Sequence, residues 1–256
     1  MNFSLIIGWV MAFGLIIFGI LSSGSINSFL DPSSFAITFG GALACLIASY
    51  PLSYLKGVPK KFVMALFPKK YSPQKYISDI VEYAQIARTR GLLALEESAN
   101  QCADPFMKSA LMLIVDANEP EKVRAMLDDS IGFMVQRHEL GRAFFERGVG
   151  LFPAFGMLGT LVGLINMLAS MNESPDGLAV GMAQALITTF YGSLFANVIF
   201  APLGMSLQNS HEDELLCMQI IEEGVLAIAA GSNPRYIQEK LEFMLPKSSI
   251  KHEGKS

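Results

Sequence analysis

The chain has 256 residues, of which 52% are hydrophobic and only 16% are charged, whereas soluble domains carry about 25% charged residues. This composition argues against an ordinary soluble enzyme. The formal net charge is −4, so no basic excess exists to bind a nucleic-acid backbone, and we expect no nucleic-acid partner. The three cysteines are widely spaced and form no CxxC pair. Neither a disulfide framework nor a metal site is predicted, and no cofactor is expected.

Charged residues are absent from long blocks of the chain, and these blocks are its strongest signal. Each block supplies the roughly 20 apolar residues that span about 30 Å of hydrocarbon as a helix. We therefore predict four transmembrane helices, near residues 3–21, 34–54, 149–170 and 182–204. The first block could instead be a cleaved signal peptide. It lacks a basic n-region, however, and three further spans follow it.

The basic residues predict how the chain is oriented in the lipid bilayer. Fourteen Lys and Arg lie between Lys56 and Arg147, and the other five lie between Arg235 and Lys255. The short loops 22–33 and 172–181 contain none. Loops rich in Lys and Arg stay on the cytoplasmic side, so we expect both larger segments and both chain termini in the cytoplasm.

The predicted fold is an all-α integral membrane protein with its polar segments on one side. Four segments are expected: spans 1 and 2 in 1–54, a mostly helical cytoplasmic domain in 55–148, spans 3 and 4 in 149–204, and cytoplasmic C-terminal helices with a tail in 205–256. Mixed apolar and charged positions predict helices near 74–88, 92–101, 105–117, 121–127 and 131–147. Asn233 and Pro234 predict the start of a last helix, which runs to about residue 245. The tail 247–256 is expected to be disordered.

The predicted spans contain no ionisable residue, although an enzyme or carrier that works in the membrane normally keeps one there. Spans 3 and 4 hold most of the polar groups, so spans 1 and 2 are expected to be the plainer, lipid-facing pair. Pro153 and Pro202 fall toward the predicted cytoplasmic ends of spans 3 and 4. Each removes an intrahelical hydrogen bond and predicts a hinge, although membrane helices also tolerate proline without any such role.

Three stretches carry a resemblance to a known family: 153–168 (PAFGMLGTLVGLINML), 181–192 (GMAQALITTFYG) and 233–235 (NPR). They closely resemble MotA and PomA, the four-span subunit of the bacterial flagellar stator, within the MotA/TolQ/ExbB superfamily. The order of segments, the number of spans and the large insertion agree as well. The resemblance implies a subunit of the bacterial cytoplasmic membrane that forms an ion channel with a single-span MotB or PomB partner, which carries the membrane aspartate.

The resemblance also implies a function and an assembly. Proton or sodium flow would drive torque on the flagellar rotor, and five such chains would form a ring around a partner dimer. Thr160 and Thr189 would line the ion pathway, and Pro153 and Pro202 would act as hinges near its cytoplasmic end. A threonine hydroxyl could replace part of the hydration shell of sodium, which a proton does not need, so sodium coupling is favoured.

A charged set in the predicted cytoplasmic domain matches the family's contact with the rotor protein FliG. Arg88 and Glu96, separated by the predicted helix breaker Gly91, match the charged pair of the family, and the neighbouring Arg90 and Glu97 could share the contact. Without the resemblance these charges would be interpreted as an ordinary solvated face, since exposed ion pairs contribute only ~0.2 to 1 kcal/mol.

Other functions remain open from the sequence. An ExbB- or TolQ-like energiser subunit shares the same ancestry but usually has three spans, and a membrane scaffold that conducts no ions is a further alternative. An enzyme is not expected. His138, His211 and His252 lack metal-ligand spacing, and the sequence has no GxSxG motif.

Overall fold

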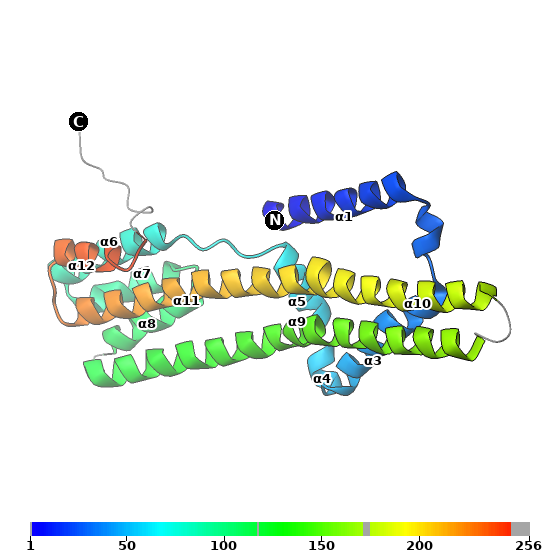
Figure 1. Ribbon diagram of the computed structural model, residues 1–256. Helices are drawn as coiled ribbons and strands as arrows, with labels where there is room; N and C mark the ends of the chain where they lie inside the picture. The colour runs from blue at the N-terminus through cyan, green and yellow to red at the C-terminus, as the bar shows by residue number, and fades with distance from the viewer. Residues whose placement is uncertain (1, 117, 171–174, 247–256) are drawn as a thin grey trace. The chain divides into compact units, whose positions relative to one another are not determined.

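The computed structural model describes residues 2–116, 118–170 and 175–246. These residues form helices joined by short connections, with no strand among them (Figure 1). The chain divides into two compact units, one made of residues 1–69 and 139–209 and the other of residues 70–138 and 210–256. Two long helices, α9 (Pro120–Ser170) and α11 (Ala201–Ala229), each contribute to both units.

The first unit contains the helical stretches that are long and apolar enough to cross a membrane. One such stretch lies in each of four helical runs: Phe3–Ser23, Ile26–Ala48, Pro120–Ser170 and Gly177–Ala229. They confirm the predicted all-helical, four-span fold. In order, the elements are α1 (Phe3–Ser23), the 3-10 helix η1 (Ile26–Phe29), α2 (Pro32–Phe35), the π-helix η2 (Ala36–Gly40), α3 (Gly41–Ala48), α4 (Leu52–Leu55), α5 (Val58–Leu66), the second part of α9, α10 (Pro175–Leu194), the π-helix η4 (Phe195–Phe200) and the first part of α11.

Two helix boundaries differ from the prediction. The second span was expected to reach residue 54, but its helix ends at Ala48, and Pro51 then adopts an extended backbone before the short α4. Proline has no N–H with which to continue a helix, and it disfavours helical geometry in the residue before it. The expected helices 121–127 and 131–147 are not separate either, because both belong to the continuous 51-residue α9.

The fourth predicted span is likewise part of a longer helical run. The helix does not end near residue 204 but continues through α11 to Ala229. The change from apolar to charged residues marks where the predicted membrane-spanning part of the helix ends. It does not mark where the helix ends, because charged residues such as Glu, Lys and Arg are good helix formers.

The second unit packs α6 (Pro73–Arg90), η3 (Leu92–Ala94), α7 (Leu95–Gln101), α8 (Pro105–Val115) and α12 (Pro234–Glu242) around the adjoining parts of α9 and α11 (Figure 1). Two of these helices, α8 and α12, begin with a capping side chain followed by proline. Asp104, for example, accepts hydrogen bonds from the N–H groups of Phe106 and Met107 at 2.9 and 3.1 Å. The core is aliphatic and includes the fully buried Ile80, Leu111 and Ile220, which hold these helices together by apolar burial.

Candidate functional site

Helices α9 and α10 approach each other so closely that their backbones are in contact. A Cβ atom built on Gly163 would lie 2.7 Å from the backbone nitrogen of Ala185, and one on Gly192 would lie 2.7 Å from the carbonyl oxygen of Phe152. Glycine is therefore required at these positions of the seam. Close approach through small residues is the usual way in which membrane helices associate.

This close approach brings Thr160 of α9 and Thr189 of α10 together. Their hydroxyl oxygens lie 2.6 Å apart and share a hydrogen bond. The Thr160 hydroxyl is also 3.0 Å from the carbonyl oxygen of Gly156 and 3.1 Å from that of Ala185. The Thr189 hydroxyl is 3.3 Å from the same Ala185 carbonyl. Two hydroxyls and two carbonyls thus form one cluster of oxygens, a chemistry that suits a hard cation or the transfer of a proton along hydrogen bonds.

The oxygen cluster faces the outside of the single chain. Thr189 is exposed and Thr160 is half-buried. The surrounding side chains are apolar and open, with Met157 64% and Leu186 66% exposed. A polar group that faces hydrocarbon is costly unless another chain or water covers it. The arrangement is therefore suited to completion by a second polypeptide.

The two prolines that were expected to act as hinges lie near a shared aromatic cluster. Pro153 is inside α9, and Pro202 lies in the first turn of α11, directly after the π-helix η4. Phe152, next to Pro153, packs against Phe195 and Phe200 of η4, with ring centroids 5.4 and 4.6 Å apart. Single π-helical turns often mark functional positions within helices, and the sequence analysis did not foresee this one.

The second span is not the plain, lipid-facing helix that the sequence analysis expected. Thr38, fully buried, donates a hydrogen bond to the carbonyl oxygen of Thr188 at 3.4 Å. Ser33 accepts a hydrogen bond from the Gln184 amide at 3.2 Å. The second span therefore packs on α10 through polar contacts, next to the hydroxyl pair. By contrast, α1 has no buried residue.

The four charges of the expected rotor contact lie on either side of one turn. Arg88 and Arg90 occupy the last turn of α6, and Glu96 and Glu97 occupy the first turn of α7. Gly91, with a φ of +83°, ends α6 between them as expected. All four side chains are exposed, and none makes an ion pair within the described part of the chain. Their charges are thus available to another molecule.

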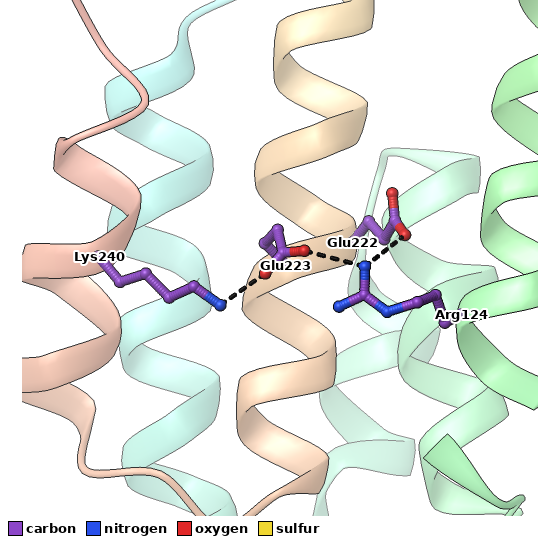
Figure 2. Close-up of polar contacts among 4 residues, drawn as sticks. All are labelled: Arg124, Glu222, Glu223 and Lys240. Atoms are coloured by element: carbon purple, nitrogen blue, oxygen red, sulfur yellow. Dashed lines mark hydrogen bonds and ion pairs between the residues drawn. The ribbon is translucent and has the colours of Figure 1, made fainter. Parts of the chain in front are cut away.

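A charged cluster of the second unit, with one buried carboxyl group, was missed by the sequence analysis (Figure 2). Glu222 of α11 is only 5% exposed. Burial, followed by the negative charge of Asp128, raises its pKa to about 7, against the opposing effect of Arg124. The available signal was a pair of glutamates, Glu222 and Glu223, set in an otherwise apolar stretch of α11.

Comparisons with known proteins match nearly the whole length of the chain. The model of the MotA/TolQ/ExbB proton channel family matches residues 98–252, and the model of the Motility protein A N-terminal region matches residues 6–90. The chain is 38% identical over 249 residues to Motility protein A of Borreliella burgdorferi, covering 96% of this chain and 95% of that protein.

Two solved structures are similar over nearly the same length. MotAB of C. jejuni matches with a TM-score of 0.89 and 28% identity, covering 98% of this chain and 100% of that chain. The flagellar MotAB stator complex of Bacillus subtilis matches with a TM-score of 0.85 and 29% identity, covering 95% and 96%.

Proposed function

The chain belongs to the MotA/TolQ/ExbB proton channel family, and from this premise we propose that it is the four-span subunit of a flagellar stator, which converts ion flow into torque. One observation carries the proposal. The fold is similar to the C. jejuni MotAB chain over 98% of this chain, and it places two hydroxyls 2.6 Å apart at the seam of the two most polar spans.

The N-terminal half favours a stator subunit over an ExbB- or TolQ-like energiser. Residues 6–90 match the Motility protein A N-terminal model, and this region includes nearly all of the first candidate span and the whole of the second. The chain also covers 100% of the MotAB chain from C. jejuni. A fourth span and a large insertion are thus shared with motility proteins.

The charged group of the ion pathway must come from another chain, because the predicted spans contain no Asp, Glu, Lys or Arg. A single-span MotB- or PomB-type partner with a membrane aspartate would place its carboxylate against the outward-facing Thr160–Thr189 pair. Each ion that crosses a potential of about 150 mV releases roughly 3.5 kcal/mol. The hydroxyls would share the ion with the carboxylate, and Pro153 and Pro202 would allow the helices to bend as the ion passes.

In this proposal, the chain is a multi-pass protein of the bacterial inner membrane. Both termini and the second unit lie in the cytoplasm, as the distribution of Lys and Arg predicts. The exposed charges at the α6–α7 turn then face FliG of the rotor. Weak, rapidly exchanging ion pairs suit a contact that must be remade at every step. Five chains around a partner dimer would form the rotating ring, with no resident cofactor other than the transported proton or sodium ion.

The proposal is tested by identifying the partner. The chain is purified gently from its native membrane, and the single-span protein that accompanies it is identified by mass spectrometry. A partner with an aspartate in its span and a peptidoglycan-binding C-terminal domain supports the stator. A partner with a short periplasmic domain that does not bind the cell wall, or no partner at all, contradicts it and favours the energiser or the scaffold.

A further inference from the structure

Charged side chains from three helices of the second unit meet in one partly exposed cluster (Figure 2). Arg124 of α9 places Nη1 3.1 Å from Glu223 Oε1 and 3.6 Å from Glu222 Oε1. Glu223 Oε2 lies 2.5 Å from Nζ of Lys240 on α12. Glu223 is thus paired with two cations at hydrogen-bonding distance. Its neighbour Glu222 has a longer contact with Arg124 and a side-chain hydrogen bond with Asp128, which requires a proton on one of the two carboxyl groups.

Glu222 is poorly compensated for a buried carboxylate. Its side chain is 7% exposed, and among the described residues no donor lies within hydrogen-bonding distance of Oε1. A buried charge without a partner is costly, and a carboxyl group avoids that cost by taking up a proton. Ile221 and Val225, which flank it on α11, are buried in the apolar core of the second unit.

The balance of charge around Glu222 points the same way. The neighbouring carboxylates are Asp128 on α9 and Glu223 on α11, and the neighbouring cations are Arg124 on α9 and Lys240 on α12. With Glu222 ionised, this group has three negative and two positive charges. One proton on Glu222 removes the surplus negative charge, and Arg124 then pairs with Glu223 alone.

We propose that Glu222 is a proton-responsive contact, which holds α9 firmly against α11 when it is protonated and loosens the packing of these two helices as cytoplasmic pH rises through neutrality. This inference rests on the proposed function only where it places the second unit in the cytoplasm. The rotor-facing unit thereby becomes stiffer in an acidified cell and more compliant in an alkaline one.

The pKa values give the direction of this effect. Burial and Asp128 raise the pKa of Glu222 from its usual 4.5 to about 7. Between these values the packed unit binds one more proton than the opened unit, so its stability is greatest on the acid side and falls as pH rises toward 7. Glu223 behaves oppositely. The hydrogen bond from Lys240 lowers its pKa, so it stays ionised throughout this range.

The expected size follows from the same linkage. With a carboxyl pKa of about 7 when packed and 4.5 when opened, the equilibrium constant for opening rises about tenfold between about pH 6 and pH 8. Glu222→Gln carries the neutral amide permanently. In that variant this tenfold rise is absent. Contributions from His138 and His211, which face each other on the same two helices, are common to both proteins and cancel in the comparison.

The test uses the full chain with its partner in lipid nanodiscs, titrated across neutral pH. Infrared difference spectroscopy follows the carbonyl stretch of protonated carboxyl groups, and amide hydrogen exchange, corrected for its intrinsic pH dependence, follows peptides within 121–130 and 218–226. We expect one carboxyl band that disappears with a midpoint near pH 7 and is missing in Glu222→Gln, together with faster exchange above the midpoint.

Two further variants keep the test decisive. Asp128→Asn removes a negative neighbour and shifts the midpoint to lower pH, whereas Glu121→Gln, an exposed carboxyl on α9, leaves it unchanged. A wild-type spectrum without a carboxyl band near neutral pH, or the same exchange profile in Glu222→Gln, overturns the proposal. Neither readout depends on torque, so a failure of the motor function would not be mistaken for a failure of the proton-responsive contact.

Discussion

Thr160 and Thr189 place their hydroxyl oxygens 2.6 Å apart across the interface of α9 and α10. The contact depends on glycine, because a Cβ on Gly156 would lie 3.1 Å from the carbonyl oxygen of Thr188, and one on Gly192 would lie 2.7 Å from that of Phe152. Two stretches of sequence that resemble the stator family, 153–168 and 181–192, therefore meet at a single polar site.

The first prediction concerns the hydroxyl pair. Thr160→Val keeps the side-chain shape but removes the hydroxyl, so we expect slower ion flux and slower swimming at a given sodium concentration, with normal assembly, since an interhelical hydrogen bond in a membrane contributes only about 0.6 kcal/mol. Swimming speed is measured while potassium replaces sodium. Ser193→Ala, an exposed hydroxyl on α10, is the matched control. A wild-type speed that does not change with the ion replacement argues for proton coupling.

The glycine seam gives a prediction about assembly. Gly163→Ala places a methyl group 2.7 Å from the backbone of both Ala185 and Gly181. Overpacking of this kind costs about 1 to 3 kcal/mol, so we expect a lower melting temperature of the purified complex and lost motility. Gly150→Ala, on the same helix with no atom within 4 Å of the added methyl, should be tolerated. Equal melting temperatures for the two variants would show that the seam is not tightly packed.

Charge reversal tests the rotor contact. Arg88→Glu or Glu96→Lys should reduce torque without reducing the amount of complex in the membrane, because both side chains are exposed and an exposed ion pair contributes only ~0.2 to 1 kcal/mol. Torque is measured on beads attached to single flagella. A compensating reversal on FliG should restore it, and Glu121→Lys should have no effect. Full torque in both reversals would place the rotor contact elsewhere.

Replacing Pro153 or Pro202 should impair rotation but not assembly of the complex. Pro153→Ala and Pro202→Ala restore a backbone N–H and remove the steric cause of bending. We expect complexes that assemble normally, as judged by co-purification of the partner, but rotate slowly or not at all. Normal rotation in both variants would mean that these prolines are merely tolerated, as prolines in membrane helices often are.

Acid should weaken the second unit through Glu223. Its pKa is lowered by the hydrogen bond from Lys240, so its stabilising effect is present above the usual value of 4.5 and is lost as pH falls below it. Lys240→Gln should lower the melting temperature at neutral pH by a small amount, because the pair is partly exposed and contributes at most about 1 kcal/mol, and should flatten the acid loss. An unchanged acid profile would show that the pair does not stabilise the unit.

The sequence was sufficient for the four spans, because charge-free blocks report membrane insertion directly. It also placed Gly91 at the end of α6, where a positive φ favours glycine. It could not show that α9 is one helix from Pro120 to Ser170. The charged residues before residue 148 keep that part of the helix out of the hydrocarbon of the membrane. They do not interrupt the backbone hydrogen bonds of the helix.

The details of the site could not be predicted, because they depend on which helices pack against one another. The π-helix at Phe195–Phe200 has no local signature, and the burial of Thr38 on α10 depends on which helix lies beside it. The burial of Glu222 likewise depends on the packing of helices. Its raised pKa arises first from burial in the folded unit and then from the negative charge of Asp128 on α9.

Rotation of tethered cells that lack their own stator tests the central claim most directly. The chain is expressed together with its single-span partner, and rotation is recorded before and after the ion gradients are dissipated with ionophores. Our account predicts that rotation is restored and that it stops when the gradients collapse. Complexes that assemble in the membrane but never turn the flagellum would contradict it.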